Sequence, residues 1–98
     1  MSKIINKDEF EELVRNSNED VLVDFYADWC GPCRMLGPIM DEISKDVTVY
    51  KVNTDNEAEL SREFGIMSIP CIIAFRNGKE LNRSVGLQGK EDILSLLK

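Results

Sequence analysis

The sequence predicts an α/β domain built on a mixed five-stranded sheet. Up to about residue 65, short apolar runs typical of strands alternate with helical patterns, and this alternation requires parallel pairing. After that point two strands follow one another across Asn77-Gly78, a strong two-residue hairpin signal, and add an antiparallel edge. The chain has 98 residues, which suffices for one core but not for two. We therefore expect a single domain spanning residues 1–98, with the order βαβαβαββα and four helices flanking the sheet.

The first half of the chain supplies two strands and two helices. Ile4–Ile5 forms a short strand, and Asn6 caps the helix that follows, with Glu9 three residues on as in a capping box. Residues 21–27 are apolar at nearly every position, as expected of a central strand covered on both faces. A helix over residues 31–45 follows, with one apolar stripe along its buried side. The stripe consists of Cys33, Leu36, Ile39, Met40 and Ile43.

The second half begins with a strand over residues 47–52. Leu60 and Phe64, four residues apart, then mark a short helix that the next glycine ends. Residues 71–75 open the hairpin, and alternating side chains should line its second strand. Those side chains are Leu81, Arg83 and Val85. A helix over residues 90–97 closes the chain, with Ile93, Leu96 and Leu97 facing inward.

Charge and composition exclude several classes of function. The chain carries 12 basic and 18 acidic residues and a net charge of −6. An acidic surface disfavours nucleic-acid binding, which depends on lysine and arginine, and it disfavours docking on anionic lipid. No apolar stretch near the start has the length of a signal peptide, and no run is long enough to span a bilayer. We expect a cytoplasmic protein, monomeric, with no nucleic-acid or membrane partner.

The pair Cys30 and Cys33 points to redox chemistry. Cys30 lies where a strand ends, and Cys33 lies in the first turn of the next helix, so both share one face within reach of a disulfide. Unpaired N–H groups and the positive dipole end of that turn stabilise a thiolate, which is the nucleophile in disulfide exchange. We expect Cys30, at the outer end, to attack a substrate disulfide, and the deeper Cys33 to resolve the mixed disulfide.

The residues around the pair fit the same chemistry. Pro32 suits a helix start because its missing N–H is not needed there, and Gly31 leaves room for another protein's backbone. Arg34 adds a positive charge. Asp24 interrupts an otherwise apolar strand, so burial should raise its pKa and make it the candidate proton acceptor for Cys33.

Other interpretations of these residues remain open at this stage. A structural zinc site needs four ligands, and this chain has no histidine and only one further cysteine. An inert disulfide would close a very small loop and stabilise the fold little. Asp24 could be satisfied by backbone donors without a catalytic role, and Trp29 could belong to the core rather than to a contact surface.

At these residues the chain resembles the thioredoxin family over essentially its full length. The strongest element runs from Asp24 to Arg34 and contains Trp-Cys-Gly-Pro-Cys. Pro38 lies where the family kinks its long helix, and Lys51 lies where the family has a lysine close to the buried aspartate. That lysine could also be a solvated charge at a strand end. Three further segments match: Ser68-Ile69-Pro70, Phe75–Lys79 and Val85-Gly86.

The resemblance implies a thioredoxin fold and a disulfide reductase recharged by a thioredoxin reductase, with protein disulfides as substrates and no bound cofactor or metal. It also implies a cis Ile69–Pro70 bond facing the dithiol and an apolar surface that receives the substrate. The expected substrate-binding residues are Trp29, Gly31, Pro32, Ile69, Pro70 and Gly86. Lys51 and Arg34 would tune the electrostatics. The alternatives are a binding subunit on the same scaffold and a dedicated electron donor to one oxidoreductase.

Some positions depart from the family pattern. Tyr26 stands where many members have tryptophan, Arg34 replaces lysine, and Ser68 replaces threonine or glycine. Cys71 directly follows Pro70, where threonine is usual. It is either a small buried apolar residue, the common fate of a free cysteine, or a regulatory thiol near the dithiol.

Overall fold

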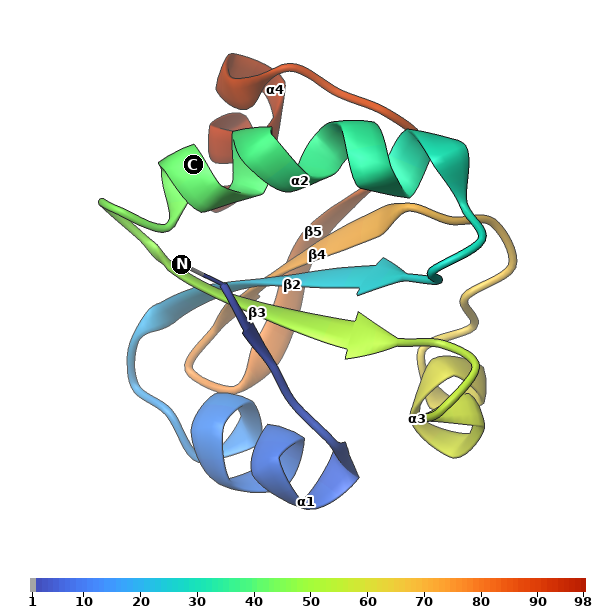
Figure 1. Ribbon diagram of the computed structural model, residues 1–98. Helices are drawn as coiled ribbons and strands as arrows, with labels where there is room; N and C mark the ends of the chain where they lie inside the picture. The colour runs from blue at the N-terminus through green and yellow to red at the C-terminus, as the bar shows by residue number, and fades with distance from the viewer. Residues whose placement is uncertain (1) are drawn as a thin grey trace.

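One five-stranded sheet with helices on both faces organises residues 2–98, the part of the chain that the computed structural model describes (Figure 1). The strands are β1 (Lys3–Ile4), β2 (Asp20–Tyr26), β3 (Thr48–Asn53), β4 (Cys71–Arg76) and β5 (Lys79–Val85). Their order across the sheet is β1-β3-β2-β4-β5. β1, β3 and β2 run parallel, while β4 runs antiparallel to β2, and β5 antiparallel to β4. The predicted mixed sheet with an antiparallel edge is confirmed.

The helices form a layer on each side of this sheet. They are α1 (Lys7–Phe10), the π-helical η1 (Glu11–Arg15), α2 (Gly31–Ile43), α3 (Ala58–Glu63), α4 (Lys90–Leu94) and the 3₁₀-helical η2 (Ser95–Leu97). In Figure 1, α2 and α4 cover one face of the sheet, and α1 and α3 cover the other. Asn6 forms the predicted capping box: its side chain accepts the Glu9 N–H at 2.9 Å, and the Glu9 carboxylate accepts the Asn6 N–H at 3.1 Å. No helix within residues 2–98 has the length and apolar character needed to cross a membrane.

Two of the predicted helices change type along their length. The first widens from α1 into η1, where the Asn16 N–H donates to the carbonyl of Glu11, five residues back, at 3.2 Å. The end of η1 also contacts the hairpin turn, because a Cβ on Gly78 would lie 2.1 Å from the Arg15 carbonyl oxygen. Asn77 and Gly78 have φ of 53° and 78°, as a two-residue hairpin turn with left-handed residues requires. The last helix tightens into η2 for its final turn.

The predicted face of β5 is wrong at one position. Glu80 pairs with Phe75 and Asn82 pairs with Ala74, so Leu81 lies between them as an extra residue. Because an extra residue reverses the alternation, Leu81 packs with the core under α2, while Arg83 donates to the Phe64 carbonyl at the end of α3, on the other side.

The alternation along β2 decides which of its side chains lie on the side of the sheet that α2 covers. Val21, Val23 and Phe25 belong to the core that faces α1 and α3, whereas Leu22 belongs to the core that faces α2. Side chains alternate along a strand, so Asp24 lies on the α2 side. A carboxyl group is thus enclosed beneath the helix that begins with the two cysteines.

Candidate active site

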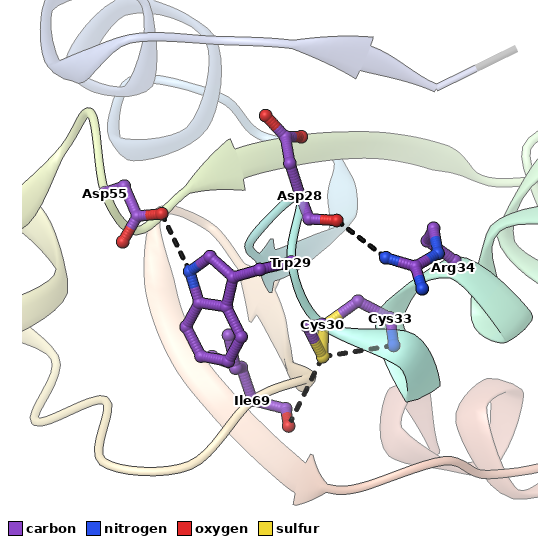
Figure 2. The surroundings of a disulfide bond; sticks show 7 residues. All are labelled: Asp28, Trp29, Cys30, Cys33, Arg34, Asp55 and Ile69. Carbon is purple, nitrogen blue, oxygen red and sulfur yellow. Dashed lines mark hydrogen bonds between the residues drawn. A yellow bond between two sulfur atoms is a disulfide. The ribbon is translucent and has the colours of Figure 1, made fainter.

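The junction between β2 and α2 holds the two cysteines in a disulfide (Figure 2). Cys30 is the N-cap of α2, with extended φ and ψ of −88° and 110°, and Pro32 occupies the first turn. The Cα atoms of Cys30 and Cys33 lie 5.2 Å apart. The Cys33 N–H donates to the Cys30 sulfur at 3.2 Å. A free N–H at a helix N-terminus, aimed at a sulfur, favours negative charge on it and hence the thiolate.

We expected Cys30 to be more exposed than Cys33, but the exposed fractions of the two residues do not differ. Both cysteines are 4% exposed, so neither is the outer residue by burial alone. Their surroundings differ instead. The Cys30 sulfur lies 3.9 Å from the carbonyl oxygen of Ile69. Cys33 lines an open hollow of about 400 Å³ together with Tyr26 and Lys51. Cys30 therefore faces the loop before β4, and Cys33 faces the opposite side.

That loop and the residue after β5 bring three of the expected substrate-binding residues together beside the dithiol. The Ile69–Pro70 bond is cis, as the resemblance implied. The Gly86 N–H donates to the Pro70 carbonyl at 2.8 Å. Gly86 has a φ of 92°, a conformation that side chains other than glycine rarely adopt. Ile69, Pro70 and Gly86 are distant from Cys30 in sequence, and the antiparallel pair β4–β5 brings them together beside it.

Trp29, which precedes Cys30 in the chain, is 68% exposed rather than part of the core. Its indole N–H donates to the Asp55 carboxylate at 2.9 Å, as Figure 2 shows. Asp55 is a site residue that sequence reasoning missed. The available signal was topological: β2 and β3 are parallel neighbours, so the loops that follow them open at the same edge of the sheet. Gly31 leaves open space where a Cβ would stand, and Pro32 is exposed.

Arg34 is not directed at the sulfurs. Its guanidinium donates to the backbone carbonyl of Asp28 at 2.8 Å (Figure 2), and the residue lines the hollow beside Cys33. The side chain thus ties the first turn of α2 back to the end of β2. A cation remains near the dithiol without a direct contact to either cysteine.

Asp24 is fully buried on the α2 side of β2. Neither of its carboxylate oxygens has a hydrogen-bond partner among residues 2–98, so it is not satisfied by backbone donors there. Burial raises the pKa of Asp24 to about 7, and the positive charge of Lys51 partly offsets this rise. Lys51 is the register partner of Asp24 on β3. Its Nζ lies 4.3 Å from the centre of the Tyr26 ring.

Cys71 is a packed side chain in this structure. It is 1% exposed and belongs to the core facing α1 and α3, next to Phe25. Burial raises the pKa of its thiol. Both observations favour the small buried residue over the regulatory thiol. The sheet lies between Cys71 and the side on which Asp24 is enclosed.

Thiol–disulfide exchange is the chemistry that this geometry serves, because the two cysteines form a disulfide at a helix start and one of the sulfurs receives a helix N-terminal N–H. Within residues 2–98, no cluster of three or more histidine, cysteine, aspartate or glutamate side chains could hold a metal ion. The class of protein defined by the site is therefore a thiol–disulfide oxidoreductase.

Comparisons with known proteins agree with this class. The thioredoxin family model matches residues 1–98. The chain is 45% identical to a thioredoxin of Mycoplasmoides gallisepticum over the full length of both chains. It is 45% identical to a thioredoxin of Rickettsia felis, covering 96% of this chain and 93% of that one. Among solved structures, a thioredoxin of Malassezia sympodialis superimposes with a TM-score of 0.87 at 31% identity, covering 99% of this chain and 89% of that one.

The chain belongs to the thioredoxin family. It is a protein-disulfide oxidoreductase, and its redox-active centre is the pair Cys30 and Cys33.

Proposed function

We propose that Cys30 is the attacking nucleophile and Cys33 the resolving thiol. The Cys30 thiolate attacks one sulfur of a substrate disulfide, forming a mixed disulfide and releasing one substrate thiolate, which takes up a proton. The Cys33 thiolate then attacks the Cys30 sulfur, closes the Cys30–Cys33 disulfide and releases the second substrate thiolate. Two electrons pass to the substrate, whose disulfide becomes two thiols. The N–H of Cys33 aimed at the Cys30 sulfur is the observation that carries this assignment.

Asp24 is the proposed proton acceptor for Cys33 in the second step. The carboxyl group is buried on the α2 side of β2 and makes no hydrogen bond within residues 2–98 that would hold it in one protonation state. A pKa of about 7 allows it to accept a proton from a thiol and return it near neutral pH.

The surface around Cys30 is the proposed docking site for a protein disulfide. It presents an exposed indole at Trp29, an open approach over Gly31 and Pro32, and the backbone of Ile69, Pro70 and Gly86. A thioredoxin reductase is the proposed partner that returns the disulfide to the dithiol. A reducing role of this kind suits the cytoplasm, where thiols are kept reduced.

The roles of the two cysteines are tested by trapping. In Cys33→Ser the first step proceeds but resolution stops, so substrates should accumulate on Cys30 as mixed disulfides that dithiothreitol releases. Cys71→Ser in the same background is the matched control and should trap equally well. Equal trapping by Cys30→Ser would overturn the assignment of the nucleophile.

The same trap separates the narrower functions. Many captured proteins indicate a general reductant, and one dominant protein indicates a dedicated electron donor. A binding subunit predicts a third result, in which the wild-type protein fails to turn over insulin with dithiothreitol but Cys30→Ser still binds one partner tightly. The matched dithiol favours the reductase, because a purely binding role does not need two paired thiols.

The role of Asp24 is tested by the rate of resolution. Asp24→Asn should slow release of a preformed mixed disulfide at pH 7 by about 100-fold or more, the range of general base catalysis. A rate equal to that of the wild type would remove Asp24 from the mechanism and leave the roles of the cysteines intact.

A further inference from the structure

Asp24 and Lys51 are placed to form an ion pair but do not form one. They are direct register partners on the adjacent strands β2 and β3. Yet neither Asp24 oxygen has a hydrogen-bond partner among residues 2–98. The Nζ atom of Lys51 lies instead over the Tyr26 ring, 4.3 Å from its centre. Asp24 and Tyr26 are two residues apart on one strand, so their side chains share a face and both lie within reach of the same ammonium group.

We propose that Tyr26 is a positioning residue whose ring holds the ammonium group of Lys51 and keeps it from pairing with the Asp24 carboxylate. The proposal deepens the proton-transfer role assigned to Asp24 and rests on it. Tyr26 itself touches neither sulfur through a hydrogen bond and acts through Lys51. The proposal assigns a function to Tyr26, which stands where tryptophan is common in the family.

The Tyr26 ring face and the Asp24 carboxylate both attract the Lys51 ammonium group, so the two contacts compete for it. A lysine ammonium over a tyrosine ring is attracted to the ring face, and the attraction is stronger in desolvated sites. Tyr26 is buried and Lys51 is half-buried, so this contact is partly shielded from water. A close ion pair would stabilise the charged carboxylate, and a stabilised carboxylate is a weaker acceptor for the Cys33 proton.

Among residues 2–98, Lys51 is the charged group that acts on the pKa of Asp24. On α2, Cys33 is in the disulfide and Arg34 donates to the Asp28 backbone carbonyl. Asp28 is exposed at the end of β2. On β4, the register partner of Asp24 is Ile72, and the thiol of Cys71 belongs to the core on the opposite face of the sheet. Burial raises the pKa of Asp24, and the position of the Lys51 ammonium group decides how far a neighbouring charge offsets that rise.

The proposal is tested by carbon-detected NMR titration of the Asp24 carboxyl in the oxidised protein. Tyr26→Leu removes the ring, so Lys51 should move to Asp24 and lower the titration midpoint by about one pH unit. Tyr26→Phe keeps the ring face and should leave the midpoint near that of the wild type. The rate of mixed-disulfide resolution should show the same difference between the variants. Its pH profile should move to lower pH in Tyr26→Leu and stay near that of the wild type in Tyr26→Phe.

A double-mutant cycle distinguishes movement of Lys51 from simple hydration of Asp24. In a Lys51→Met background, Tyr26→Leu and Tyr26→Phe should have the same midpoint, because the charge that moves is gone. A full-sized drop that persists in this background would show that water entry is the cause and would overturn the proposal. An unchanged midpoint in Tyr26→Leu with Lys51 present would also overturn it.

A measurement on the unmutated protein covers the case in which Tyr26→Leu fails to fold. Protons next to Nζ of Lys51 lie over an aromatic face and should resonate upfield of ordinary lysine values. Ordinary values would refute the contact. Failure of the proposed function is distinguishable, since it shows as normal resolution in Asp24→Asn regardless of where Lys51 lies.

Discussion

Replacing Asp24 by asparagine should stabilise the oxidised protein, and the gain should grow with pH. The carboxyl group is fully buried, with no hydrogen-bond partner for its oxygens within residues 2–98. Burial raises its pKa from 3.8 to about 7 in the folded protein. Between these values the folded protein holds a proton that the unfolded chain has released. The wild-type free energy of unfolding therefore falls as pH rises from about 4 to about 7, and then levels off.

The size of the effect follows from the two pKa values. The slope reaches about 1.4 kcal/mol per pH unit, so the full loss between 3.8 and about 7 amounts to about 4 kcal/mol. Asparagine has nearly the same volume and does not ionise, so it escapes this loss. Asp24→Asn should thus match the wild type near pH 4 and exceed it by about 2 to 4 kcal/mol at pH 8, the lower figure allowing for hydration of the charged form.

Urea denaturation of the oxidised proteins, repeated from pH 4 to pH 8.5, measures this difference through the midpoint and the slope. Asp28→Asn is the matched control, because it removes an exposed carboxylate four residues along the same segment and should give a difference near zero at every pH. A gain for Asp24→Asn that is constant across the range would refute the reasoning, as would one that is largest at pH 4.

Three further outcomes follow from the same structure. Asp55→Ala should free the Trp29 indole, raise KM for a protein disulfide several-fold and change tryptophan fluorescence. The free energy of unfolding should change by less than about 0.5 kcal/mol. An unchanged KM would show that this hydrogen bond plays no part in docking. Cys71 in the oxidised protein should resist alkylation at pH 7.5 until urea unfolds the chain, and labelling as fast as a free thiol would contradict its burial. Gly78→Ala should lower the free energy of unfolding by at least about 1 to 2 kcal/mol, since its φ is left-handed and η1 leaves no room for a Cβ. Gly89→Ala is the control, because Gly89 has open space for a Cβ and a negative φ, and it should lower the free energy of unfolding clearly less.

Much of the architecture was predictable because it depends on local chemistry. The capping box at Asn6, the hairpin at Asn77-Gly78 and the apolar run of β2 each require particular residue types at particular spacings. The β-bulge in β5 was not predictable, because Leu81 is an ordinary strand residue and only its partners on β4 show that one residue is extra.

The dithiol was also visible in sequence. Two cysteines three apart after an apolar strand fall at a helix start wherever that strand and helix form, so Cys30, Cys33 and the buried charge of Asp24 follow from the chain itself. The equal 4% exposure of the two cysteine residues did not follow, because it depends on how the rest of the fold packs around each of them.

The order of elements, the redox pair and the enclosed carboxyl are consequences of local sequence, since helix ends, strand alternation and apolar runs act over a few residues. Tertiary structure alone decided the partners across the sheet. It directed Trp29 to Asp55, Arg34 to a backbone carbonyl and Lys51 to the Tyr26 ring. Each of these side chains could reach several partners, and only the packed positions of neighbouring strands and loops select one of them.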